Sequence, residues 1–127
     1  MKIISLQHIA IEDPGTFKDF LLADGHELTT IQLDEGENIP SNLDEFDAML
    51  CMGGPMDTFM EDEFNWLVGE KKAIGEYVLN LKKPFLGFCL GCQLLGEVLG
   101  GKVVQSNPPE IGVLDIDVSD QAITDPV

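Results

Sequence analysis

Short apolar runs alternate along the chain with longer segments whose apolar residues recur at helical spacing. The predicted elements, in order, are a strand at residues 2–6, a helix at 14–24, strands at 28–33 and 48–52, a helix at 64–81, a strand at 85–88 and a helix at 92–99. Further strands are predicted at 102–105 and, from its alternating apolar residues, at 112–118. Alternation of strands and helices is typical of an α/β domain with a mainly parallel sheet.

The helix at residues 64–81 has the clearest pattern. Its apolar residues share one helical face, and they are Leu67, Ile74, Val78 and Leu81. Three acidic residues at 61–63 precede it, where the positive end of the helix dipole favours negative charge. The first helix has end signals of its own, because Asp13 and Pro14 are typical of a helix start and Gly25 of a helix end.

Two glycines follow the apolar strand at residues 48–52, which reads as a strand covered on both faces. Gly53 and Gly54 lie at its carboxyl end, the edge at which open α/β sheets bind ligands. Glycine there allows bare backbone N–H groups to approach a ligand. Taken alone, Gly-Gly-Pro is also consistent with an ordinary turn.

The segment at residues 87–93, Gly-Phe-Cys-Leu-Gly-Cys-Gln, places a thiol at a sharp turn from a buried strand into a helix. This pattern is typical of a nucleophile elbow. Gly87 and Gly91 remove side chains where strand and helix crowd together, and the helix N-terminus favours the thiolate and an incoming oxyanion. Cys89 is therefore the candidate nucleophile. The alternative is a buried cysteine at a strand end, with glycines that serve packing alone.

Two other interpretations of the cysteines are weaker. Cys89 and Cys92 have the spacing of a redox pair, but the motif follows several strand and helix units and its glycines suit an elbow better. A zinc site would need Cys51, His8 or His26, which show no ligand spacing. We expect Cys51 in the core and Cys92 as a small packing residue on the helix.

Composition and charge exclude some classes of partner. The 127 residues, 44% of them hydrophobic, suffice for one small core and are too few for two ordinary domains. All 7 basic residues are lysines, and with 23 acidic residues they give a net charge of -16. Such a charge repels nucleic acids and anionic membrane surfaces, so we expect neither as a partner.

The location is predicted from what the sequence lacks. No run approaches the roughly 18 apolar residues of a membrane span, and the start of the chain has no secretion signal. The cysteines are odd in number, and their spacing is not that of a secreted disulfide framework. We therefore expect a soluble cytoplasmic protein with reduced thiols, and no cofactor is indicated.

The motifs occur in an order that resembles the class I glutamine amidotransferase family, and most closely its free-standing, GMP synthase-like branch. The matching segments are Gly-Gly-Pro-Met-Asp at 53–57, Glu-Asp-Glu at 61–63, Trp-Leu at 66–67, Pro-Phe-Leu-Gly-Phe-Cys-Leu-Gly-Cys-Gln-Leu-Leu at 84–95, Leu-Gly-Gly-Lys-Val at 99–103 and Glu-Ile-Gly at 110–112. The resemblance implies a flavodoxin-like three-layer sandwich with a mainly parallel sheet, incomplete at its C-terminal end. It also implies that residues 1–127 are the N-terminal portion of a single domain of this family.

The resemblance also implies a reaction. Cys89 would attack the side-chain amide of glutamine, giving a γ-glutamyl thioester and ammonia, and water would then clear the thioester. The N–H groups of Gly54 and Leu90 would form the oxyanion hole, and Gln93 would help to hold the substrate. A solvated or packing role is the alternative for Gln93. The implied partners are glutamine and an ammonia-accepting synthetase domain or subunit, with a second copy of the chain as a further candidate.

The sequence departs from the family in one respect. Members complete the catalytic triad with a histidine and a glutamate well after the cysteine, whereas both histidines here, His8 and His26, precede Cys89. We therefore expect a fragment that is nearly inactive alone. The alternatives are a noncatalytic glutamine-binding or scaffold relative and a γ-glutamyl peptidase of the same fold.

Overall fold

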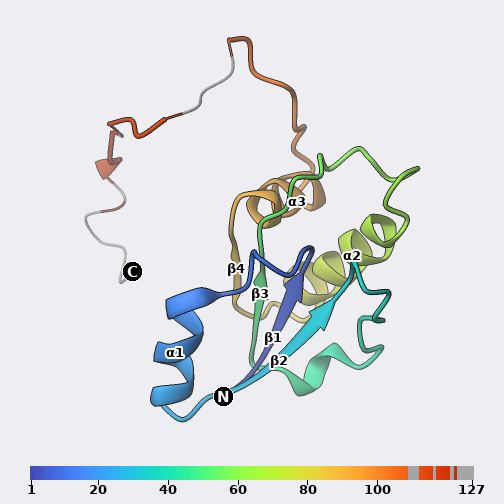
Figure 1. The fold of residues 1–127 in the computed structure, drawn as a ribbon, viewed down its shortest axis with the longest axis vertical. Helices are drawn as coiled ribbons and strands as arrows, with labels where there is room; N and C mark the ends of the chain where they lie inside the picture. The colour runs from blue at the N-terminus through green and yellow to red at the C-terminus, as the bar shows by residue number, and fades with distance from the viewer. Residues whose placement is uncertain (109–111, 116, 121, 123–127) are drawn as a thin grey trace.

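The structure is a computed structural model that describes residues 1–108, 112–115, 117–120 and 122. Within these residues, one sheet holds four parallel strands in the order β2-β1-β3-β4 (Figure 1). The strands are β1 (Lys2–Gln7), β2 (Glu27–Gln32), β3 (Ala48–Cys51) and β4 (Phe85–Gly87). This order is the beginning of the flavodoxin-like strand order, which confirms the predicted fold class.

Helices cover both faces of the sheet (Figure 1). On one face lies α1 (Gly15–Ala23). On the other lie α2 (Trp66–Gly75), its continuation as a π-helical turn, η2 (Glu76–Asn80), and α3 (Leu90–Val98), while a short 3-10 helix, η1 (Leu43–Glu45), precedes β3. No helix among the described residues is both long and apolar enough to cross a membrane.

The two faces of the sheet differ in how many apolar side chains are buried against them. Successive residues of a strand point to opposite faces, so Ile4 and Leu6 of β1 face α2 and α3, whereas Ile3 faces α1. The α2 and α3 side holds the larger cluster, and its fully buried members include Leu67 and Leu94. Helix α1 has no buried residue. The core that supports the carboxyl edge of the sheet therefore lies between β1, β3, α2 and α3.

Both α1 and α3 end in the way their glycines predict. After α1, the N–H of Gly25 donates to the carbonyl of Leu22 at 3.0 Å and that of His26 donates to Leu21 at 3.0 Å. Gly25 and Gly100 have φ values of 78° and 89°, a conformation that glycine adopts without steric cost. The predicted helix ends are therefore confirmed.

The predicted boundaries of all three helices need adjustment. Helix α3 begins at Leu90, two residues before the predicted start, and α2 begins at Trp66, two residues after its predicted start. Helix α1 starts one residue later than expected, with Pro14 at the cap position, although Asp13 still accepts a hydrogen bond from the N–H of Gly15 at 3.0 Å. The predicted helix at 64–81 is α-helical only to Gly75 and then widens into η2. A further buried residue, Tyr77, lies in this wider turn and donates to the carbonyl of Phe46 at 3.0 Å.

The two strands predicted after α3 are wrong for the residues that the structure describes. Residues 102–105 form no strand, and neither do the described members of 112–118, among which Val113 and Leu114 are exposed. Residue 116 and the family-like Glu110 and Ile111 lie outside the described residues. A strand needs a neighbour for its backbone hydrogen bonds, and the segment after α3 runs outside the body of sheet and helices (Figure 1).

Candidate active site

The turn between β4 and α3 has the geometry of an elbow. Strand β4 ends at Gly87 and α3 begins at Leu90, so Cys89 is the residue at the corner. Its backbone has φ 49° and ψ -106°, outside the regions that residues with a side chain favour. Its thiol is exposed. A non-glycine residue held in such a conformation is typical of a functional turn.

The glycines on either side of Cys89 make this corner possible. A Cβ atom on Gly87 would lie 2.5 Å from the carbonyl carbon of Gly91. A Cβ atom on Gly91 would lie 2.7 Å from the carbonyl carbon of Cys51 and would overlap its oxygen. Backbone therefore packs directly against backbone where β3, β4 and α3 meet, as predicted from the glycine spacing.

The loop after β3 lies beside the elbow. A Cβ atom on Gly53 would be 3.5 Å from the Cβ of Cys89, and one on Gly54 would be 3.2 Å from Cδ2 of Leu90. The Glu12 carboxylate also reaches Gly53, since an added Cβ there would overlap its Oε2. The structure thus brings together Cys89, Leu90 and the Gly53-Gly54 loop.

Several backbone N–H groups at this corner have no acceptor among the described residues. Among the described residues, the N–H groups of Gly54 and Leu90 have no hydrogen-bond acceptor, whereas that of Gly91 is bonded to Phe88 at 2.9 Å. Leu90 is the first residue of α3, where N–H groups have no partner within the helix. Gln93 lies in the first turn of α3 with an exposed side chain.

The three cysteines lie in three different environments. Cys51 is fully buried, as predicted, and its thiol donates to Oε1 of Glu70 at 3.3 Å. Burial, together with the charge and hydrogen bond of Glu70, raises the pKa of Cys51 well above its ordinary value. Cys92 is exposed, so its predicted packing role is wrong. All three thiols, including that of Cys89, are free.

A buried histidine to which the sequence analysis gave no role in the site also contacts the Gly53-Gly54 loop. His8 has no exposed surface, and its Nδ1–H donates to the carbonyl of Gly53 at 2.8 Å. Its Nε2 lies 2.7 Å from Oε1 of Glu70, and Trp66 stacks on the ring with centroids 5.3 Å apart. Burial lowers the pKa of His8, but the hydrogen bond and charge of Glu70 outweigh burial and raise that pKa overall.

The sequence did carry a signal for this pair. Glu70 lies three residues after Leu67 and four before Ile74, on the apolar face of α2, and it is fully buried. A carboxylate on such a face is rarely buried without a partner. That partner, His8, lies 62 residues away in the sequence, so its identity follows only from the fold.

His8, Cys51 and Glu70 are also the residues that could hold a metal ion within the described part of the chain. Each offers one ligand atom, and these atoms lie within 4.8 Å of one another. Nitrogen, thiolate and carboxylate ligands together suit zinc. The hydrogen bonds from His8 and Cys51 to Glu70 already satisfy the trio, apart from Oε2 of Glu70, which has no partner.

The segment after the Gly53-Gly54 loop is tied to both helices. Thr58 is buried, and its hydroxyl donates to Oε1 of Glu97 on α3 at 2.7 Å. Lys71 of α2 pairs with Glu97 and with Glu61, each at 2.8 Å. These contacts hold the connection between β3 and α2 in place beside the elbow.

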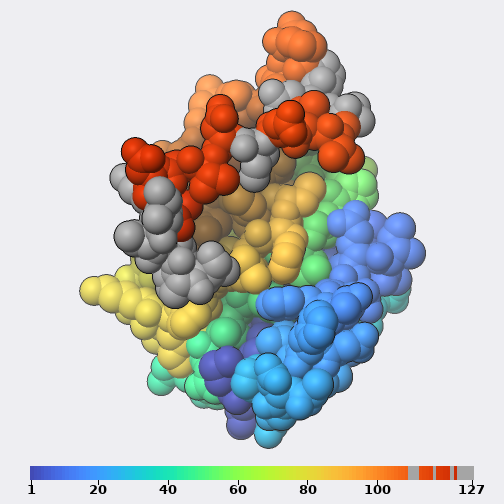
Figure 2. Space-filling view, turned by 90° about the vertical axis from the view of Figure 1, so that its left-hand side faces the viewer, coloured from blue at the N-terminus to red at the C-terminus, as the bar shows by residue number. Residues whose placement is uncertain are grey.

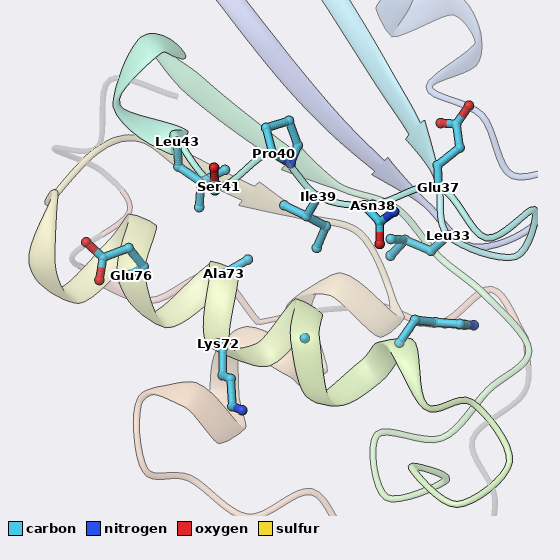
Figure 3. A pocket seen from close by; sticks show the side chains of 12 residues that line it. Leu33, Glu37, Asn38, Ile39, Pro40, Ser41, Leu43, Lys72, Ala73 and Glu76 are labelled. Carbon is cyan, nitrogen blue, oxygen red and sulfur yellow. The ribbon is translucent and has the colours of Figure 1, made fainter.

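A hollow lies away from the elbow, between α2 and the segment that follows β2 (Figure 3). It has a volume of about 520 Å³. Its lining includes Leu33, Ile39, Pro40, Trp66, Lys72 and Ala73. None of the predicted site residues lines it, so it is separate from the cysteine site.

Comparisons with known proteins point to one family. The sequence matches the model of the glutamine amidotransferase class-I family over residues 18–124. It is 30% identical to a glutamine amidotransferase-like protein of Salmonella typhimurium (strain LT2), over 100% of this chain and 54% of that protein. It is 34% identical to a glutamine-hydrolysing GMP synthase subunit of Sulfurisphaera tokodaii, over 62% of this chain and 39% of that protein.

Solved structures show the same likeness. A glutamine amidotransferase from Methylobacillus flagellatus superposes with a TM-score of 0.79 and 31% identity, over 87% of this chain and 43% of that one. One from Thermotoga maritima gives a TM-score of 0.74 and 31% identity, over 79% and 43%. The chain spans between 39% and 54% of the length of these proteins. Sequence and fold together show that this chain belongs to the class I glutamine amidotransferase family.

Proposed function

We propose that Cys89 is the nucleophile of a glutamine-hydrolysing site. The observation that carries this proposal is the strained backbone of Cys89 at the N-terminus of α3, beside the Gly53-Gly54 loop. Its thiolate sulfur forms a bond to the side-chain amide carbon of glutamine, and the carbon-nitrogen bond then breaks. The nitrogen leaves as ammonia after taking up a proton, and water hydrolyses the thioester to glutamate and the free thiol.

The charge that develops on the amide oxygen needs donors already in place. The free N–H groups of Gly54 and Leu90 supply two such donors, and the N-terminus of α3 adds its favourable dipole. Gln93 lies one turn further on and provides an amide for contact with the bound substrate. Removal of one such donor typically costs about 100-fold to 1000-fold in kcat.

The catalytic base, in our proposal, comes from outside these 127 residues. His8 is buried with both ring nitrogens engaged, at Gly53 and Glu70. The ring of His26 lies 3.5 Å from the terminal amine of Met1, at the opposite edge of the sheet from the elbow. Neither imidazole can therefore shuttle a proton to the leaving ammonia, and this chain alone should be nearly inactive.

We propose that the ammonia is used by a synthetase domain or subunit, as the name of the GMP synthase relatives suggests. We also propose a cytoplasmic location, because three free thiols are typical of a reducing compartment.

Ammonia release from glutamine by the intact protein tests the assignment. Cys89→Ala should abolish release while the fold, followed by circular dichroism, is unchanged. Cys92→Ala is the matched control, because Cys92 is an exposed thiol one turn further along α3, and it should retain activity. Undiminished release by Cys89→Ala, or turnover by residues 1–127 alone, would contradict the proposal.

A further inference from the structure

In the peptide bond between Gly53 and Gly54, the carbonyl group is hydrogen-bonded and, within the described part of the chain, the N–H group is not. Its carbonyl oxygen accepts the hydrogen bond from Nδ1–H of His8 at 2.8 Å, and its N–H, on Gly54, has no acceptor among the described residues. The two groups of a planar trans peptide point in opposite directions. The bond from His8 therefore sets the direction in which the Gly54 N–H points.

This peptide needs such a restraint more than others do. Both of its residues are glycines, which reach many backbone conformations at similar energy, so the peptide can turn over easily. A side chain that would restrict the loop is disfavoured at Gly54, because an added Cβ would lie 3.0 Å from Sδ of Met56 and 3.1 Å from Cβ of His8 and would push these neighbours aside. The loop must therefore be held from outside its own residues.

His8 is itself held on three sides. Its Nε2 lies 2.7 Å from Oε1 of Glu70, and Trp66 stacks on the ring with an interplanar angle of 15°. Because a carbonyl oxygen only accepts hydrogen bonds, Nδ1 must carry a hydrogen whatever the state of Nε2. Glu70 Oε1 also accepts the Cys51 thiol, so β1, β3 and α2 all fix the imidazole.

Stability alone does not explain why this pair includes a buried carboxylate oxygen without a partner in the described part of the chain. Oε2 of Glu70 is buried without a partner among the described residues, and a buried carboxylate with an unpaired oxygen costs free energy. In general, replacing a buried ion pair by apolar residues of similar volume is often neutral or stabilising. Such a costly group at the edge of a site calls for a functional role.

We propose that His8, held by Glu70, is a positioning residue that orients the Gly54 N–H toward the oxyanion formed at Cys89. This inference rests on the proposed function and deepens it. His8 does not touch the reacting atoms. It acts through the Gly53 carbonyl, and its contribution is to keep the oxyanion donor directed before glutamine arrives.

Two substitutions of His8 distinguish a role in orienting the Gly54 N–H from a role in packing alone. The amide nitrogen of asparagine lies where Nδ1 lies in histidine, so His8→Asn retains a donor to Gly53 and loses the contact with Glu70. The amide nitrogen of glutamine lies where Nε2 lies, so His8→Gln retains Glu70 and loses Gly53. Both variants replace a buried ring with an amide, so a purely structural role predicts similar losses in both.

Glutamine hydrolysis by the intact protein is the first measurement. We expect kcat of His8→Gln to fall about 100-fold with KM within about 3-fold, because one oxyanion donor is misdirected. His8→Asn should stay within about 10-fold of the wild type. Equal losses in the two variants, or no loss in His8→Gln, would overturn the inference. Inactivity of the wild type, or activity of Cys89→Ala, would instead overturn the proposed function.

Nuclear magnetic resonance of the intact wild-type protein gives a second test that needs no variant. The Nδ1–H of His8 should show a through-bond coupling to the carbonyl carbon of Gly53, both before and after Cys89 is captured by an aldehyde analogue of glutamine. The Gly54 N–H should shift when the tetrahedral adduct forms. Absence of the coupling, or an unchanged Gly54 signal in the adduct, would overturn the inference even if a His8 variant fails to fold.

Discussion

At the residue scale, the cysteines of this site differ in their exposure to solvent and in their electrostatic surroundings. Cys89 is exposed at the corner before α3, whereas Cys51 is buried, and burial together with Glu70 raises the pKa of Cys51. In the native chain, iodoacetamide should therefore label Cys89 before Cys51, and Cys51 should stay unlabelled until urea unfolds the protein. Peptide mass spectrometry over a time course reports each thiol separately. Equal labelling of all three thiols would count against the elbow.

His8 should make the stability of the fold depend on pH. Its pKa in the folded chain lies above the ordinary value of 6.5, so the protonated ring stabilises the fold. This contribution is complete below the pKa of the unfolded chain and is lost as the pH rises through the folded pKa. Between pH 6 and 8.5, the free energy of unfolding should therefore fall with pH by at most about 1.4 kcal/mol per pH unit.

The single tryptophan makes this easy to follow, because Trp66 stacks on His8. Urea unfolding monitored by its fluorescence gives the free energy of unfolding at each pH. His8→Asn should lack most of the pH dependence in that range. A wild type whose stability rises with pH there would show that the His8 and Glu70 pair does not favour the proton.

At the scale of elements, the close approach of α3 to β3 sets the position of the elbow. Gly91 and Gly96 both lie in α3, but only an added Cβ on Gly91 meets backbone, that of Cys51, while Gly96 faces open space. Gly91→Ala should therefore destabilise the fold by about 2 kcal/mol or more. Gly96→Ala should stabilise it by up to about 1 kcal/mol, because alanine favours a helix. The urea concentration at the midpoint of unfolding should be measured for both variants. Similar midpoints would contradict the close packing of Gly91 against Cys51.

The same elements show what a sequence can and cannot predict. Period and end signals located β1 to β4 and α1 to α3 within a few residues, because those signals are local. Alternation at 112–118 indicated which side chains share a face, but not whether a neighbouring strand exists, and that prediction failed. The pairing of His8 with Glu70 joins distant positions, so it followed only from the fold.

At the scale of the whole molecule, apolar exposure and net charge act against each other. On the α1 side of the sheet, a hollow of about 440 Å³ is lined by apolar residues that include Ile3, Phe17, Leu50 and Leu86. The residues around β4 (gold) are visible between α1 (blue) and the segment after α3 (orange to red) in Figure 2, and Leu86 is 42% exposed. Exposed apolar surface of this kind favours association.

The net charge of -16 opposes that association, because like-charged copies repel one another until salt screens them. Residues 1–127 alone should therefore sediment as a monomer in 10 mM NaCl and associate increasingly toward 500 mM. Leu86→Glu should suppress the association at high salt. Leu79→Glu, at a residue of η2 that is 50% exposed and outside this hollow, adds the same charge and should not suppress it. If both variants suppress association equally, net charge alone controls it and the apolar face of β4 does not.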